Sequence, residues 1–394
     1  MTPGEFPPTP QAAQARLAAL RPSDYARSRN HLDGAVTRLS PYITHGFLSL
    51  PQVVAWLRDR HGIGTDHKLV QELGWRAFFQ HAWRHDGEGI LSSLHHGPLS
   101  DSAYARELPA DIRQGRSGVP AIDQAVRALY ATGYVHNHAR MWLASYCVHV
   151  RKVHWRAGAD WMLSHLLDGD LGSNHLSWQW VAGTGSSKPY LFNADNVARY
   201  APMAWHSRGT VIDASYEALH ALAHQPRNGG PEPGEHHGIA EPDLLRSPPT
   251  HGFRRPDARA IAGRDVWLVH PWSLGEVPAG CLPVAVCDAD VHARWPWSAA
   301  RWQWVAARMA AMTPLRWFAT GAELRLALAA ADSVRGWANP HLGPALSALD
   351  LAEPPLAFDE PAARCRSFSA FWSRVQARQP NPHPRSTQGD LFHV

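Results

Sequence analysis

The sequence has few cysteines, no long apolar run and no leader-like beginning. Only four of the 394 residues are cysteine, and none forms a Cys-x-x-Cys pair. This scarcity argues against a disulfide framework or a cysteine metal site, and indicates buried thiols in a reducing, cytoplasmic compartment. No stretch approaches the about 18 apolar residues of a membrane span, and the N-terminus lacks the basic and apolar regions of a secretory signal. We expect a cytoplasmic protein that does not engage membranes.

Charged residues are also scarce, whereas tryptophan is abundant. Asp, Glu, Lys and Arg make up 18% of the chain, with a formal net charge of +4, whereas tryptophan occurs 18 times. A small positive excess is compatible with a nucleic-acid-binding face, although many soluble proteins share it. The abundance of tryptophan indicates stacking or electron transfer in addition to core packing.

Residues 11 to about 225 repeat apolar side chains at helical spacing, without the alternation of strands. A Pro-, Gly- and His-rich linker follows, in which His236 and His237 fit a stray metal or, more simply, a solvated linker. Short apolar runs then alternate with amphipathic segments, which predicts a small, largely parallel α/β sheet. The expected helices are Gln11–Leu20, Leu48–Leu57, Leu69–Trp83, Val119–Ala131, His138–Val153, Ala159–Leu167, Ser298–Met312 and Ala322–Ala331. The expected strands are Asp265–His270, Leu282–Cys287, Leu315–Phe318 and Val334–Ala338.

This pattern divides the chain into four parts. We expect a helical domain over residues 1–225, a linker over 226–260, a small α/β domain over 261–345, and a C-terminal helix with a loose tail over 346–394.

The segment from Leu166 to Trp180 combines two acids, an amide and two indoles. Asp168 and Asp170 can accept hydrogen bonds from a heteroaromatic ring and a ribose, and Asn174 can donate or accept. Trp178 and Trp180 offer flat faces for stacking or electron transfer. Because an unpaired buried charge is very costly, this grouping is more typical of a cofactor site than of a packed core.

Three other segments carry polar groups in suggestive patterns. Thr37, Arg38 and Ser40 precede a helix that Pro41 can start, which suits either a diphosphate or ordinary caps. Glu72, Trp75 and Arg76 share a helical face, although a surface Glu72–Arg76 ion pair beside a core tryptophan explains them equally well. Asn137, Arg140 and Met141 share another face, from which Arg140 can neutralise Asp168 or Asp170.

In order and spacing, these segments resemble the flavin-binding domain of the DNA photolyase/cryptochrome family. Thr37-Arg-Leu-Ser-Pro-Tyr is similar to its phosphate loop, Glu72-Leu-Gly-Trp-Arg to its ELxWREF motif, His136-Asn-His-Ala-Arg-Met to HNRxRM, and Asp168-Gly-Asp through Trp180 to DGDxAxNxxxWQW. The resemblance extends over about residues 25–200. It implies a mainly α fold, with an all-helical FAD-binding domain followed here by the small, Rossmann-like α/β domain.

The resemblance implies bound FAD and assigns residues to it. Asp168 and Asp170 would hold the flavin edge and the adenosine, Arg140 would pair with Asp168, and Asn174 would face flavin N5. Val36 stands where the family usually has threonine. The implied cofactor-binding residues are Tyr25, Thr37, Arg38, Leu39, Ser40, Arg76, Arg140, Asp168, Asp170 and Asn174.

The resemblance also implies an enzyme, a deoxyribodipyrimidine photolyase. Its substrate would be UV-damaged DNA with a flipped-out cyclobutane pyrimidine dimer, split under blue light by an electron from reduced flavin. The implied catalytic residues are Glu72, Trp75, Asn137, Met141 and Trp180. Flavin reduction would use Trp178 and Trp155, with Tyr104 the nearest counterpart of the third, surface tryptophan and Trp142 an unusual indole nearby.

Two departures from the family pattern leave an alternative open. The usual antenna domain is not found before Tyr25, and the segment over 261–345 is either a displaced, reduced copy or an unrelated module. The missing antenna domain and the altered tryptophan electron-transfer chain fit a cryptochrome-like photoreceptor without repair activity. We expect no antenna chromophore, no other metal and, because no cysteine follows Trp180 until Cys281, no iron–sulfur cluster. We expect a monomer.

Overall fold

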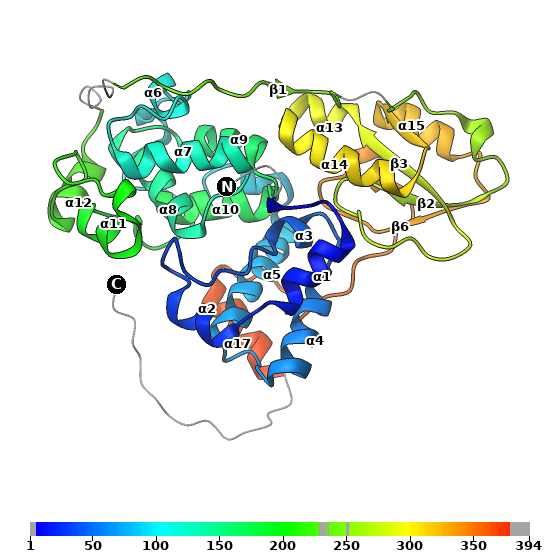
Figure 1. Ribbon diagram of the computed structural model, residues 1–394, viewed down its shortest axis with the longest axis horizontal. Coiled ribbons are helices and arrows are strands. Elements are labelled where there is room, and N and C mark those ends of the chain that lie inside the picture. Colours follow the sequence, from blue (N-terminus) through cyan, green and yellow to red (C-terminus); the bar gives the residue numbers. More distant parts are fainter. Residues whose placement is uncertain (1–4, 228–233, 235, 250–251, 379–394) are drawn as a thin grey trace.

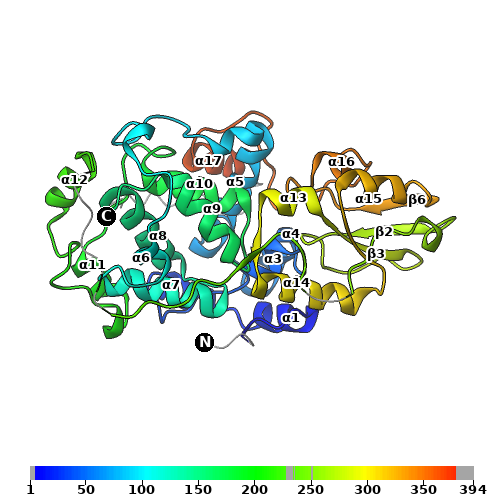
Figure 2. The ribbon, with the colours of Figure 1, turned by 90° about the horizontal axis from the view of Figure 1, so that it is seen from above.

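The computed structural model describes residues 5–227, 234, 236–249 and 252–378. Helices build the first half of the chain, and a four-stranded sheet with flanking helices builds the second (Figure 1). Seen from above, the α/β part lies at one end of an elongated molecule, beside the first helices of the chain (Figure 2). The mainly α fold with a small α/β region is the one predicted from the sequence.

The helices of the first half occur close to their predicted positions. A capping box between Ser49 and Gln52 starts α4, and Gly62 ends it in the left-handed conformation at φ 64°. The predicted helix 138–153 is divided, because α8 passes into a π-helical turn over Tyr146–Val150. The helices are α1 (Pro10–Ala18), α2 (Pro22–Ser28), α3 (Ser40–Thr44), α4 (Leu50–His61), α5 (Lys68–Asp86), α6 (Ala110–Arg113), α7 (Pro120–Thr132), α8 (Asn137–Ser145), α9 (Trp155–His165), α10 (Leu171–Ala182), α11 (Ala194–Tyr200) and α12 (Tyr216–His224).

The second half contains the predicted parallel sheet. Its order is β5-β3-β2-β6, and all three pairings are parallel, with Val266 opposite Leu282 and Val334. Its elements are β2 (Asp265–Val269), β3 (Leu282–Asp288), α13 (Ala289–Arg294), α14 (Ala299–Met312), β5 (Arg316–Ala319), α15 (Gly321–Leu328), β6 (Ser333–Gly336) and α16 (Pro344–Ser347). Ser298 caps α14, as expected, by accepting from the Arg301 backbone amide.

The described part of the predicted linker packs on the protein. The Ile239 amide donates to the Gln114 carbonyl at 2.8 Å, and Arg113 pairs with Glu241 at 2.8 Å. Further on, β1 (Leu244–Leu245) pairs antiparallel with β4 (Trp297–Ser298). Most of these residues are exposed, but backbone pairing and Ile239 anchor the segment to the protein. Within the described residues no group of side chains suits a metal ion.

The helical and α/β parts share one hydrophobic core. The indole of Trp304 on α14 donates to the Phe6 carbonyl at 2.6 Å and lies 5.4 Å from the ring of Phe47. Residues of β2, β3 and α14 belong to the same buried cluster as those of α1, α3 and α4. The α/β part thus covers an apolar face of the first helices, as burial of apolar surface favours. Among the described helices, none is long and apolar enough to cross a bilayer.

The last described helix returns to the helical part. Helix α17 (Phe368–Arg378) lies beside α5 (Figure 1). Trp372 fills the space above Gly74 on α5, where a Cβ atom would lie 2.2 Å from the indole. Glycine is needed at this position because any side chain would push the two helices apart. The predicted loose tail beyond residue 378 lies outside the described residues.

Candidate functional site

The acidic hairpin between α9 and α10 is buried where the helical part meets Arg301 of the α/β part. Both Asp168 and Asp170 are buried, and Gly169 separates them. A Cβ atom on Gly169 would lie 2.5 Å from Arg301 Nη1 and 2.7 Å from the Leu163 carbonyl oxygen. The close approach of Arg301 therefore requires glycine between the two acids.

Asp168 is neutralised as the sequence predicted. Arg140 Nη2 donates to both of its carboxylate oxygens, at 3.0 and 2.8 Å. Burial would raise the pKa of Asp168, but Arg140, Ser40 and Arg76 outweigh it, and the pKa lies below its ordinary value. Asp168 is thus a carboxylate at neutral pH, with hydrogen bonds that favour the charged form.

Asp170 has a different set of partners. It caps α10 by accepting from the Ser173 amide at 2.8 Å, and its other oxygen accepts from Gln80 at 2.8 Å. Burial again opposes ionisation, yet Arg76 and His341 hold the pKa of Asp170 below its usual range. The hairpin therefore presents two carboxylates, each with donors from a distant segment.

Arg76 connects α5 to the end of α3 and, through Thr44, to the acidic hairpin. Its Nη2 donates to Thr44 at 2.6 Å, and Thr44 Oγ1 donates to the Asp168 carbonyl at 3.2 Å. The alternative ion pair between Glu72 and Arg76 is not formed. Glu72 instead contacts Arg29 at the end of α2, at 3.2 Å. The end of α3, the middle of α5, α8 and the acidic hairpin therefore meet at one point.

The turn before α3 has an unusual backbone. Arg38 has φ 52°, in the left-handed region that costs energy outside glycine, and its guanidinium ion-pairs with Glu5. The Leu39 amide donates to Thr37 Oγ1 at 3.4 Å, while the Leu39 side chain is buried in the core. Because its side chain is buried, Leu39 can contact a ligand only through its backbone. Ser40 forms the hydrogen bond that helps to lower the pKa of Asp168.

Glu72 lies beside Arg29 and Tyr25. Burial raises the pKa of Glu72, and Arg29 only partly offsets this effect. Burial, followed by the charge of Glu72, raises the pKa of Tyr25. At the N-terminus of α8, His138 meets the Asn30 carbonyl at 2.8 Å. The end of α2 thereby links the two helices that carry Glu72 and Asn137.

The remaining predicted catalytic residues pack against two different hydrophobic clusters. Asn137 is exposed, and its Nδ2 lies 3.8 Å from the sulfur of Met141 one turn along α8. Trp180 and Met141 pack against the core of α7 to α10, whereas Trp75 packs against the core that includes α17. Trp75 stacks on Phe368, with ring centroids 4.0 Å apart and planes at 11°.

The predicted electron-transfer residues lie around α9 (Trp155–His165). Trp178 is buried against Gly158, where a Cβ atom would lie 2.3 Å from the indole. Trp155 is buried one turn away, 5.6 Å between centroids from His154, which lies 6.3 Å from Tyr104. Burial raises the pKa of Tyr104 to about 12. Trp142 is itself fully buried, and its indole donates to Asn196 at 3.0 Å.

Sequence reasoning missed several residues of this region. Thr44 and Gln80 each lie one helical turn beyond a predicted residue, Ser40 and Arg76, so helical spacing would have indicated them. Arg29, Glu5 and Arg301 reach the site through tertiary contacts alone, and no local sequence pattern indicates them.

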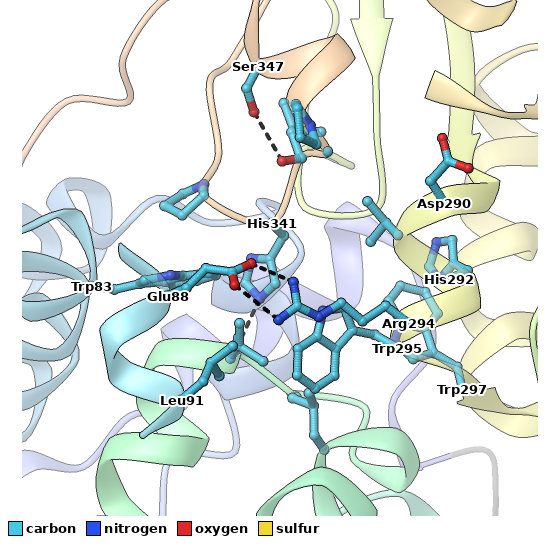
Figure 3. Close-up of a pocket in the computed structure, with 18 of the residues that line it drawn as sticks. Trp83, Glu88, Leu91, Asp290, His292, Arg294, Trp295, Trp297, His341 and Ser347 are labelled. Atoms are coloured by element: carbon cyan, nitrogen blue, oxygen red, sulfur yellow. Dashed lines mark hydrogen bonds and ion pairs between the residues drawn. The ribbon is translucent and has the colours of Figure 1, made fainter. Parts of the chain in front are cut away.

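A cavity of about 390 Å³ lies beside the hairpin, between the helical and α/β parts (Figure 3). Its wall includes three indoles and two imidazoles, and an ion pair between Arg294 and Glu88 spans the two parts. None of the predicted site residues lines it, although Gly169 and Leu171 do. The lining includes Trp83, Trp295, Trp297, His292, His341 and Arg301.

The fold brings an acidic hairpin and a hydroxyl-bearing turn together within a helical domain. Residues 69–210 match the family described as the FAD binding domain of DNA photolyase. Through this segment the chain is similar to the FAD-binding domain of the DNA photolyase/cryptochrome family.

Curated relatives bear both names of the family. A deoxyribodipyrimidine photo-lyase of Thermus thermophilus is 37% identical over 195 residues, 47% of this chain and 45% of that protein. One from Streptomyces griseus is 36% identical over 167 residues, 42% and 36% of the two chains. Cryptochrome-1 of Arabidopsis thaliana is 32% identical over 178 residues, 41% and 25%. The matched segment thus covers less than half of each relative.

Among solved structures, the cryptochrome of Synechocystis sp. PCC6803 is similar, with 28% identity and a TM-score of 0.45. The similarity covers 50% of this chain and 44% of that one.

Proposed function

We propose that this protein is an FAD-dependent, blue-light-driven DNA photolyase that splits cyclobutane pyrimidine dimers. The observation that carries the proposal is the meeting of α3, α5 and α8 at the buried Asp168–Asp170 hairpin. Such a cluster of paired, partly accessible polar groups in an apolar surround is typical of a cofactor site. The names of the curated relatives support the reaction.

The residues of the cluster fit FAD. Asp168 and Asp170 are ionised acceptors for ring N–H and ribose groups, and Arg140 keeps the first of them charged. Ser40 and the backbone of the turn at Thr37–Leu39 offer donors for a diphosphate. Ser173 Oγ is buried without a partner at the start of α10, so a polar ligand atom has a group to meet there.

Asn174 has a defined orientation. Its Nδ2 donates to the Ala159 carbonyl at 2.8 Å, which uses one of the two N–H groups of the amide. The amide oxygen remains as an acceptor, which suits a flavin ring N–H. When bound, FAD supplies the absorption of blue light and the electron.

The lesion would be held by the second group of residues. Trp75 and Trp180 offer flat faces to the two bases, and stacking contributes about 1–3 kcal/mol per base. Extruding a damaged base pair costs less than extruding an intact one. Glu72, with its raised pKa, is placed to share a proton with a base carbonyl, and Asn137 and Met141 provide an amide and a soft sulfur beside it.

Trp178 and Trp155 would carry electrons inward, with Tyr104 as the outer member, and no iron–sulfur cluster or antenna chromophore is proposed. The α/β part is assigned a structural role: it buries an apolar face of the helices and supports the hairpin through Arg301. Damaged DNA is the proposed partner of a monomeric protein.

The test is repair of a dimer-bearing oligonucleotide by the FAD-loaded protein. The proposal predicts restoration under blue light and none in darkness, with activity lost in Glu72→Ala at unchanged flavin content. Repair in darkness, or no repair at full flavin occupancy, contradicts it.

A second function, that of a flavin photoreceptor, is favoured by one observation. Phe368 already stacks on one face of Trp75 in the free protein, which would give this indole a structural role in a photoreceptor. A photoreceptor would bind FAD and respond to light but would not distinguish dimer-bearing from intact DNA.

A further inference from the structure

The C-terminal helix contributes an aromatic ring to the proposed lesion clamp. Phe368, the first residue of α17, lies flat on Trp75, while Phe78 and Phe79 meet the same indole at 81° and 41°. Phe368 thus takes one of the two faces of Trp75. Trp75 keeps part of its surface exposed, so the indole is not fully enclosed by these three rings.

The stack continues into α17. Trp372, one turn beyond Phe368, is parallel to it within 19°, with centroids 5.6 Å apart. The three rings therefore form a column that runs from Trp372 through Phe368 to Trp75. Since aromatic rings in contact restrict each other's tilt, the column determines the plane in which Trp75 is presented.

The column is fixed to α5 by several contacts. Trp372 occupies the space above Gly74, directly beside Trp75 in sequence. Phe371 packs on Phe78, with centroids 5.7 Å apart. Before the helix, Arg364 forms a two-pronged ion pair with Asp86 at the end of α5, at 2.6 to 2.9 Å. The position of Phe368 is therefore set by the docking of α17 and not by a free loop.

We propose that Phe368 is a positioning residue for lesion recognition, which holds the Trp75 indole in the plane that a flipped-out pyrimidine base stacks upon. This inference rests on the proposed function and adds a residue nearly 300 positions from Trp75 to its substrate site. It also explains how Trp75 can be stacked in the free protein and still serve a ligand, because the lesion would extend the column and not replace its inner ring.

The experiment compares the binding of FAD-loaded variants to dimer-bearing and to undamaged DNA by fluorescence anisotropy. Phe368→Leu keeps apolar volume but removes the flat ring, and Phe368→Tyr keeps the ring. Val375→Ala is the matched control, because Val375 is buried on the same helix. Phosphate contacts contribute to both DNA affinities, whereas base stacking contributes only to the dimer affinity, so the ratio isolates stacking.

Phe368→Leu should weaken the preference for dimer DNA about five- to tenfold, the equivalent of roughly one stacked base. Phe368→Tyr and Val375→Ala should keep the preference, and flavin content should be equal throughout. An unchanged preference in Phe368→Leu, or an equal loss in Val375→Ala, overturns the role of the ring. If the unmodified protein does not distinguish the two DNAs, the proposed function itself fails. Should Phe368→Leu not fold, Phe368→Met provides the same comparison.

Discussion

Arg301 Nη2 donates to the carbonyl oxygen of Gly169 at 2.6 Å, although the two residues lie 132 positions apart. Arg301 Nη1 donates to the Leu163 carbonyl at 2.8 Å, and the guanidinium lies 4.0 Å from the centre of the Trp297 ring. Burial lowers the pKa of Arg301 to about 9, against the opposing charges of Asp168 and Asp170. An arginine of the α/β part thus supports the acidic hairpin of the helical part.

Replacing Arg301 by Met should destabilise the fold and loosen the hairpin. Two buried carbonyl groups lose their donors, and an unsatisfied buried group costs about 1–3 kcal/mol. We expect a loss of roughly 2 kcal/mol in the free energy of unfolding, with faster loss of FAD, measured by urea denaturation and flavin absorbance. The exposed Arg325→Met is the control and should change stability by less than about 0.5 kcal/mol. Equal stability of both variants would refute the supporting role.

Acid should destabilise the protein through the hairpin. The pKa values of Asp168 and Asp170 lie below their ordinary values in the folded protein. Their contribution to stability is therefore complete above the unfolded pKa of about 4 and is lost as the pH falls through the lower folded values. Unfolding by urea at several pH values should show this decline, and Asp168→Asn should make it shallower. Asp59→Asn, at an exposed position, should leave the slope as it is.

Removing the positive charge beside Glu72 should shift its titration upward. Burial raises the pKa of Glu72 and Arg29 lowers it, so Arg29→Met should raise the pKa further and keep Glu72 protonated to higher pH. The pH profile of blue-light repair should move toward higher pH in this variant and lose that step in Glu72→Gln. Arg27→Met, on the same helix but paired with Asp24, should not move it. A profile that stays in place in Arg29→Met rules out this coupling.

Photoreduction of bound FAD should distinguish the two candidates for the outer electron donor. Trp155→Phe should largely abolish light-driven bleaching of the flavin in the presence of a thiol reductant. Tyr104→Phe should slow it, because Tyr104 reaches Trp155 through His154, whereas Trp142→Phe should not, because that indole is enclosed. Slower bleaching in Trp142→Phe than in Tyr104→Phe would instead identify Trp142 as the outer electron donor.

Gly158 should tolerate no side chain. An added Cβ would lie 2.3 Å from the Trp178 indole, and inserting a methyl group in a packed core costs about 1–3 kcal/mol. Gly158→Ala should lower the melting temperature and displace Trp178, which tryptophan fluorescence detects. The exposed Gly62 is an unsuitable control because of its positive φ, and Ala157→Ser on the same helix serves instead. A melting temperature unchanged by Gly158→Ala would show that α9 moves away freely.

The sequence predicted much of this fold and part of the site. Helical spacing located α4, α5 and α7 within a few residues, and β-branched runs located β2 and β3. The Arg140–Asp168 pair followed from the family motifs. The partners of Glu72, the support of Gly169 by Arg301 and the covering of Trp75 by Phe368 did not, because they depend on how segments far apart in sequence pack together. The packing of the segment around Ile239 was not predicted, because the composition of that segment resembles that of a solvated linker.

The central claim is that FAD is held between the Asp168–Asp170 hairpin and the turn at Ser40. Titration of the flavin-free protein with FAD, followed by flavin fluorescence, tests it most directly. We predict saturation at a single FAD per chain, with affinity reduced at least tenfold by Asp170→Leu, roughly the free energy of one charge-assisted hydrogen bond, and little changed by the exposed Asp59→Asn. Absence of FAD binding, or equal affinity in the Asp170→Leu protein, would contradict the claim.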